Sequence, residues 1–250
     1  MAAVMGIDIG GSGIKGTLVD VESGEMLEDR FRLPTPVKAR PDDVAETVAD
    51  VVKHFNYRGP VGYGFPAVVR RGVVYTAANI SKSWIETHVE DLFKTVTGCP
   101  AYVLNDADAA GLAEMKFGVG KDHPKGVILM ITLGTGLGTA IFVDGKLVPN
   151  TELGHIEIRG KDAERRASDA VRQKKELTWE EWADRLNEYL RTMERLFWPD
   201  LIVLGGGVSK MSHKFIPLLR LRTPVVPARL LNQAGMIGAA VYAHQRAQEQ

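Results

Sequence analysis

The chain has 250 residues, 45% of them hydrophobic and 25% charged, and its 31 basic residues balance its 31 acidic ones. This composition is that of a globular protein with a sizeable core, and a net charge of zero gives no overall attraction to nucleic acid or to an anionic membrane. The one cysteine, Cys99, excludes an intrachain disulfide and a cysteine zinc site, and the absence of a leader-like N-terminus or a membrane-length apolar run predicts a cytoplasmic protein.

In the first half, apolar runs bounded by turn residues predict strands, and apolar residues at helical spacing predict helices. Strands are expected at 4–9, 14–19, 26–33, 61–65, 73–75 and 101–104. Helices are expected from Asp42 or Asp43 to Phe55, from His88 to Val96 and from Ala107 to Phe117.

The second half repeats this order. Strands are expected at 127–133, 138–143, 146–148, 201–204 and 225–227, and helices at 179–197 and 235–245. The repeated order predicts an α/β protein of two similar lobes, which we place at residues 1–108 and 109–250.

Two glycine-rich turns stand half a chain apart. Asp8–Gly13 and Thr132–Gly138 each separate two apolar runs, and Gly10 meets Gly134 at an offset of 124 positions. Such turns expose backbone N–H groups that suit phosphate oxygens, although each turn alone is also an ordinary hairpin turn. Neither the Walker A spacing nor a strand-to-helix dinucleotide fingerprint is present. The pair therefore predicts a two-sided cradle for a phosphate chain.

Side chains at these turns are candidates for phosphate and metal binding. Asp8 could hold Mg²⁺ directly or through water, or could cap its turn. Lys15 could face the phosphates or solvent. The expected phosphate-binding set is Asp8, Gly10, Gly11, Ser12, Gly13, Lys15, Thr132, Gly134, Thr135 and Gly136.

The segments Asp8–Gly16 and Leu133–Thr139 resemble the two phosphate motifs of sugar kinases in the actin/hexokinase/Hsp70 superfamily, and most closely those of the ROK family. The resemblance implies two ribonuclease H-like, actin-like ATPase lobes with a cleft between them. It implies transfer of a phosphoryl group to the 6-hydroxyl of glucose or a related sugar, with Mg²⁺ as cofactor, and a homodimer.

The resemblance also implies the sugar site. Asn105-Asp106 follows a predicted strand and opens a predicted helix, where one of the two can serve as the N-cap. In the family the Asp is the catalytic base and the Asn holds the sugar. Glu152-Leu-Gly-His155 matches the family's Glu-x-Gly-His sugar motif, and Glu164, with Glu157 as the alternative, completes the set. Gly64 and Asn79 are further sugar-site candidates, against plain turn roles.

Most family members place a cysteine-rich zinc segment after this His, and this chain has none, so no structural zinc is expected. This loss is expected of the branch of the family that uses polyphosphate as donor. Basic residues that follow His155 are candidates for a polyphosphate track, against a solvated surface: Arg159, Lys161, Arg165, Arg166, Arg172, Lys174 and Lys175. The turn Gly205–Gly207 resembles the family's adenosine-side turn, so ATP also stays a possible donor; its residues are Gly205, Gly206 and Gly207.

Three alternatives remain open. The first is a hexose kinase that uses ATP alone. The second is a sugar-sensing protein without activity; family repressors carry a DNA-binding segment before the first strand, and here that strand is expected to begin at Val4. The third is a structural actin-like protein, which the sugar motifs disfavour.

Overall fold

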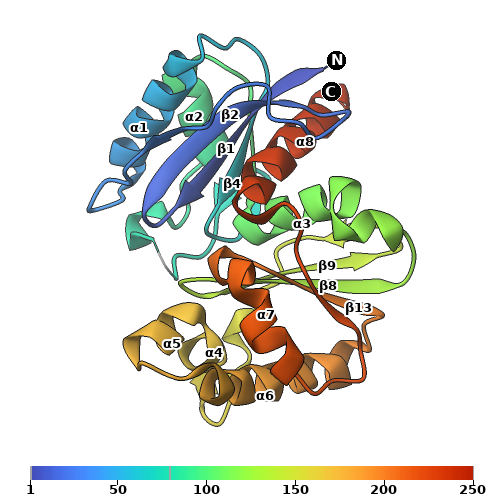
Figure 1. Cartoon of the computed structure of the whole chain (residues 1–250). Coiled ribbons are helices and arrows are strands. Elements are labelled where there is room, and N and C mark those ends of the chain that lie inside the picture. Colours follow the sequence, from blue (N-terminus) through green and yellow to red (C-terminus); the bar gives the residue numbers. More distant parts are fainter. Residues whose placement is uncertain (1, 79, 250) are drawn as a thin grey trace. The chain divides into compact units, whose positions relative to one another are not determined.

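The computed structural model describes residues 2–78 and 80–249 (Figure 1). It divides into two compact units, one formed by Met1–Ala113 with Gln233–Gln250 and the other by Glu114–Asn232. The sequence places the lobes at 1–108 and 109–250, whereas in the structure residues 233–250 group with the first unit.

The first unit is built on a five-stranded sheet of order β3-β2-β1-β4-β7. β1, β2 and β3 are antiparallel neighbours, and β4 and β7 run parallel to β1. The strands are β1 (Ala3–Gly10), β2 (Gly13–Asp20), β3 (Phe31–Leu33), β4 (Val61–Phe65) and β7 (Ala101–Asn105), with a small hairpin of β5 (Val69–Arg70) and β6 (Val73–Val74). The helices are α1 (Pro41–His54), η1 (Lys82–Trp84), α2 (Val89–Thr97), α3 (Asp106–Phe117), which continues into the second unit, and α8 (Ala234–Gln248).

The second unit repeats this pattern with the sheet order β10-β9-β8-β13-β14. Three antiparallel strands are again followed by two strands parallel to the first, which confirms the duplication expected from the glycine turns. The strands are β8 (Val127–Leu133), β9 (Leu137–Val143), β10 (Lys146–Val148), β11 (Glu157–Ile158), β12 (Lys161–Asp162), β13 (Leu201–Gly205) and β14 (Val225–Pro227). The helices are η2 (Val119–Asp122), η3 (Leu153–His155), α4 (Glu164–Ala167), α5 (Asp169–Lys174), α6 (Trp179–Phe197), η4 (Gly207–Met211), α7 (Ser212–Phe215), η5 (Ile216–Leu218) and η6 (Leu231–Gln233).

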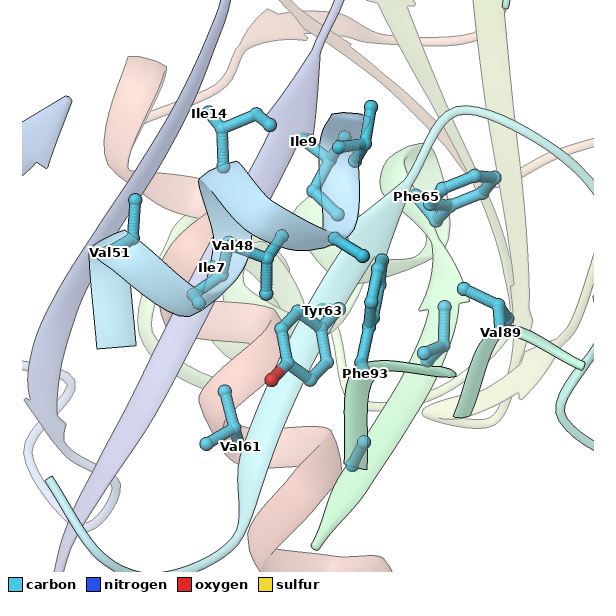
Figure 2. Packing of buried hydrophobic residues seen from close by; sticks show 14 of the residues in the cluster. Ile7, Ile9, Ile14, Val48, Val51, Val61, Tyr63, Phe65, Val89 and Phe93 are labelled. Atoms are coloured by element: carbon cyan, nitrogen blue, oxygen red, sulfur yellow. The ribbon is translucent and has the colours of Figure 1, made fainter. Parts of the chain in front are cut away.

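Burial of one face of each sheet stabilises both units. In the first unit Ile7, Tyr63 and Phe93 meet valines of α1, as Figure 2 shows. In the second unit α6 buries a stripe of large side chains that includes Trp182 and Tyr189. Burying such residues is the main favourable term in folding.

The other face of the first sheet takes α8 directly against backbone (Figure 1). A Cβ atom at Gly62 would lie 1.8 Å from the carbonyl oxygen of Ala239, and one at Gly6 would lie 1.9 Å from that of Met236. Only glycine permits this approach, which explains why the last helix belongs to the first unit.

One expected strand is shorter than predicted. Residues 26–33 form a strand only over Phe31–Leu33, and Met26 makes an isolated bridge to Val19. The carbonyl of Glu28 accepts a hydrogen bond from the Thr17 hydroxyl at 2.7 Å, so a side chain here replaces part of the strand ladder. Within the described residues every helix is too short or too polar to cross a bilayer.

Candidate active site

The first phosphate turn is a two-residue hairpin. β1 and β2 pair as far as Gly10 and Gly13, which leaves Gly11 and Ser12 as the exposed turn. A Cβ at Gly11 would meet no atom within 4 Å, so this turn borders open space. It lines a cavity of about 320 Å³ together with Thr35, Lys38 and other residues.

Two side chains hold the carbonyl groups of this turn. Arg32 donates to the carbonyl of Ser12 and Thr35 donates to that of Gly10, each at 2.5 Å. The Arg32 guanidinium also lies where a side chain on Gly13 would stand, 2.4 Å from the ideal Cβ position. Sequence reasoning missed both residues, because neither belongs to the glycine motif.

Asp8 and Lys15 face each other across the hairpin. They are partners in the register, and the Lys15 Nζ lies 2.9 Å from the Asp8 Oδ2. Lys15 therefore pairs with Asp8 and does not extend into solvent. The Asp8 side chain keeps 18% exposure, and Gly235 at the start of α8 would bring a Cβ within 3.0 Å of it. A carboxylate has about four acceptor positions, of which Lys15 takes one, so this carboxylate fits Mg²⁺ held through water.

Asn105 and Asp106 stand where β7 ends and α3 begins. The Asn105 Oδ1 accepts from the N–H groups of Ala107 and Asp108 at 2.8 and 3.2 Å, and its Nδ2 donates to the carbonyl of Ala67 at 3.2 Å. Asn105 is therefore the N-cap of α3. Asp106, which is half-buried, accepts from the N–H of Ala107 at 2.8 Å.

Gly64 lies beside Asp106 on the neighbouring strand. A Cβ at Gly64 would be 3.6 Å from the Asp106 Cα and 3.5 Å from the Ala109 Cβ, which is ordinary van der Waals contact with the first turn of α3. Asn79, the other candidate for this region, lies outside the described residues.

The second phosphate turn differs from the first. Gly134 donates its N–H to the carbonyl of Gly136 at 3.1 Å, so this amide already has a partner inside the turn. Thr135 at the tip is exposed, and Thr132, the penultimate residue of β8, pairs with Gly205 of β13.

The turn Gly205–Gly207 lies against the second phosphate turn. Gly206 has φ 84°, and a Cβ there would lie 2.3 Å from the carbonyl oxygen of Leu133. On the other side, Ala170 of α5 donates its N–H to the carbonyl of Gly134 at 3.1 Å. The structure thus gathers the turn Gly205–Gly207, the turn Gly134–Gly136 and α5 in one place.

The sugar motif converges on His155. Its Nε2 lies 3.4 Å from a carboxylate oxygen of Glu152, and its Nδ1 lies 3.3 Å from Asp162 and 4.0 Å from Glu164. Glu164 is thus brought to the histidine, whereas Glu157 is exposed on β11. Burial raises the pKa of Glu152 and the nearby Glu164 adds to this, while His155 acts in the opposite direction.

Residues that sequence reasoning did not select position this motif. The Thr139 hydroxyl donates to the carbonyl of Thr151 at 2.6 Å and accepts from the N–H of Leu153 at 3.1 Å. A Cβ at Gly154 would lie 2.2 Å from the carbonyl oxygen of Leu137. The second glycine hairpin therefore directly positions the loop that carries the Glu152–His155 motif. Thr139 closes the second motif in the sequence, which was the available signal.

The side chains of His155, Asp162 and Glu164 could together hold a metal ion, since one ligand atom of each lies within 4.8 Å of the others. The same groups also suit hydrogen bonds to sugar hydroxyls, because carboxylates accept and an imidazole both donates and accepts.

Comparison with known proteins gives a consistent result. The model of the ROK family matches residues 4–169. A polyphosphate glucokinase of Mycobacterium tuberculosis (strain CDC 1551 / Oshkosh) is 50% identical over 237 residues, covering 94% of this chain and 89% of the relative.

Two crystal structures extend the comparison. The inorganic polyphosphate/ATP-glucomannokinase from Arthrobacter sp. strain KM has a TM-score of 0.95 and 49% identity, covering 98% of this chain and 100% of that chain. A ROK family glucokinase from Streptomyces griseus, in complex with glucose and AMPPNP, has a TM-score of 0.84 and 26% identity, with the same coverage of both chains.

Proposed function

This chain belongs to the ROK family, and from that premise we propose that it is a polyphosphate glucokinase. It transfers the terminal phosphoryl group of inorganic polyphosphate to the 6-hydroxyl of glucose, and ATP serves as a second donor. The observation that carries the proposal is the 50% identity, over 94% of the chain, to a polyphosphate glucokinase.

Asp106 is the proposed catalytic base. It takes the proton of the sugar 6-hydroxyl while that oxygen attacks the terminal phosphorus, and the bond from phosphorus to the rest of the chain breaks. The polymer leaves one phosphate shorter. Asn105 fixes the N-terminus of α3, and Gly64 lies next to Asp106 on the neighbouring strand.

Glucose is bound by the convergent side chains of the second unit. Glu152, His155 and Glu164 accept and donate hydrogen bonds to sugar hydroxyls, with Asp162 orienting the imidazole. The half-buried carboxylates favour a polyhydroxylated ligand over a phosphorylated one, because a second negative charge here would be repelled.

Mg²⁺ is the proposed cofactor, held near Asp8 through water. When bound, it neutralises charge on the phosphate oxygens. Lys15 beside Asp8 and the amides of the exposed turn Gly11–Ser12 provide further positive partial charge at the first phosphate turn.

Donor choice is tested directly with the purified protein. Glucose phosphorylation is measured with long-chain polyphosphate, with tripolyphosphate and with ATP, each supplied alone with Mg²⁺. We expect turnover with polyphosphate. Activity with ATP alone would replace the proposal by an ATP-only hexose kinase, and no turnover with any donor would favour a sugar-sensing protein. Mannose in place of glucose tests the sugar specificity.

We further propose a cytoplasmic homodimer. This proposal rests on the resemblance to the ROK family, which implies two subunits. Light scattering of the purified protein measures the mass directly.

A further inference from the structure

A cavity of about 450 Å³ in the second unit lies apart from the sugar motif. Its walls carry four arginines and two acidic residues: Arg159, Arg166, Asp184, Arg185, Glu188 and Arg191. α6 provides the last four on successive turns of one face, and the chain from β11 to α4 provides Arg159 and Arg166. Sequence reasoning had assigned the α6 residues no function.

The charges in this cavity do not cancel. Glu188 forms ion pairs with both Arg159 and Arg166, with N–O distances of 2.5 and 2.7 Å. Burial alone would raise the pKa of Glu188, but the hydrogen bonds from these two arginines outweigh it and lower the pKa. Asp184 is exposed, and within the described residues Arg185 has no ion pair within 4.0 Å. Four guanidinium groups against two carboxylates leave two positive charges.

Arginine is the side chain best suited to a chain of phosphates. Its planar guanidinium binds two oxygens at once, is always charged and loses hydration readily. The cavity falls within the range of about 300–1,000 Å³ typical of ligand pockets, and so is larger than one phosphate group requires. Arg191 is held in place by its donation to the carbonyl of Arg220 at 3.2 Å.

A single segment links this cavity to the phosphate machinery. Arg166 lies in the cavity and Glu164, two residues before it, reaches the sugar motif. Four residues after Arg166, the N–H of Ala170 donates to the carbonyl of Gly134 in the second phosphate turn. The short stretch 166–170 therefore lines the cavity at its first residue and contacts the second phosphate turn at its last.

Arg172, another basic residue of this stretch, is less suitable. Arg172 pairs with Asp169 at 2.7 Å, and its guanidinium lies 4.2 Å from the centre of the Trp179 ring. Asp169 also accepts from Gln173. Arg172 therefore serves the packing of α5 on α6.

We propose that the arginine cavity binds phosphates of the donor chain away from the phosphate being transferred, as an anchoring site for long polyphosphate. The inference rests on the proposed donor. Anchoring keeps the reacting end of a long polymer at high effective concentration near the second phosphate turn. Tripolyphosphate and ATP occupy the transfer site without needing this cavity.

The test compares Arg185→Ala/Arg191→Ala with the wild-type protein and with Arg30→Ala/Lys146→Ala, which removes two exposed charges elsewhere. Thermal unfolding of each protein checks that all three fold. We expect KM for long polyphosphate to rise at least about tenfold in the cavity variant, because two charge-assisted contacts are lost. The values of kcat, and KM for tripolyphosphate and ATP, should stay near wild type. The control variant should resemble wild type throughout.

Direct binding separates this inference from the proposed function. Fluorescence anisotropy of labelled long-chain polyphosphate is measured with each protein, with no glucose present. Weaker binding by the cavity variant than by the control supports the anchoring site, even in a protein that does not use polyphosphate as donor. Equal binding by the two variants overturns it, as does a wild-type protein that fails to bind the polymer. An equal rise in KM for all three donors also overturns it, because the residues would then serve the transfer site.

Discussion

At the scale of single residues, Asn105 and Asp106 have different roles: Asn105 caps α3, and Asp106 is the proposed catalytic base. The amide of Asn105 is engaged at both ends, by α3 and by the carbonyl of Ala67. Asp106 stands one residue further along, at the first position of the helix. The sequence predicted that one of the pair would cap the helix. Which one does so depends on the backbone direction at the strand end, which no local pattern reports.

The Asp106→Asn variant tests the proposed base. Asparagine keeps the oxygen that accepts from the N–H of Ala107, so the melting temperature should stay the same. It cannot take a proton, so kcat for glucose phosphorylation should fall by about 10²- to 10⁴-fold. Asp50→Asn, an exposed change on α1, is the control. Near-normal turnover of Asp106→Asn would remove this residue from the mechanism.

At the scale of elements, the last turn of α3 carries a buried carboxylate. Glu114 is 1% exposed, and its two oxygens accept from the N–H of Val119 at 3.1 Å and from that of Leu230 at 2.6 Å. One side chain therefore joins the end of α3 to a loop more than a hundred residues later. The sequence gives no sign of this role, because both N–H groups that Glu114 accepts from lie outside its helix.

The Glu114→Gln variant tests this junction. An amide offers one oxygen, so one of the two N–H groups would face an NH₂ group. We expect a loss of roughly 1–3 kcal/mol in the free energy of unfolding, the cost of leaving a buried donor unpaired. Urea denaturation measures it, with the exposed Glu157→Gln as control. Equal stability of the two variants would show that these contacts contribute nothing.

Elements with strong local signals were predicted with accurate bounds. α6 begins and ends as expected at Trp179 and Phe197, since the Thr178 capping box fixes its start and an apolar stripe marks its length. The strand expected over 26–33 failed because the Thr17 hydroxyl takes a carbonyl that the ladder would use. Side-chain competition of this kind carries no periodic signature.

At the scale of the whole molecule, the duplicated sheet could be predicted because both copies keep the glycine turn and the order of elements. The packing partner of the last helix, α8, could not be predicted from the sequence. α8 lies against Gly6 and Gly62, which stand more than 170 positions earlier in the chain. A glycine within a strand indicates that another segment packs closely against it, but it does not indicate which segment.

A chain ending at Asn232 tests the role of α8. It would expose the face of β1 and β4 and lose the burial of Met236, Ile237 and Val241, each worth about 1.5–3 kcal/mol. That sum is comparable to a domain's whole stability of about 5–15 kcal/mol. We expect amides of β1 and β4 to lose hydrogen-exchange protection while those of β8 and β13 keep it. A chain lacking only residues 248–250 is the control, and full protection of β1 in the shorter chain would contradict the assignment.

The first phosphate turn has a thermodynamic consequence. Arg32 and Thr35 hold its carbonyl oxygens before any donor arrives. In the proposed reaction, donor binding then requires little loss of backbone entropy, and the amides need no reorientation as charge builds up on the transferred group. Folding has therefore already fixed the peptide dipoles of this turn, through hydrogen bonds from two side chains of a neighbouring segment. In the proposed reaction, no further free energy is needed to orient these dipoles when the donor binds.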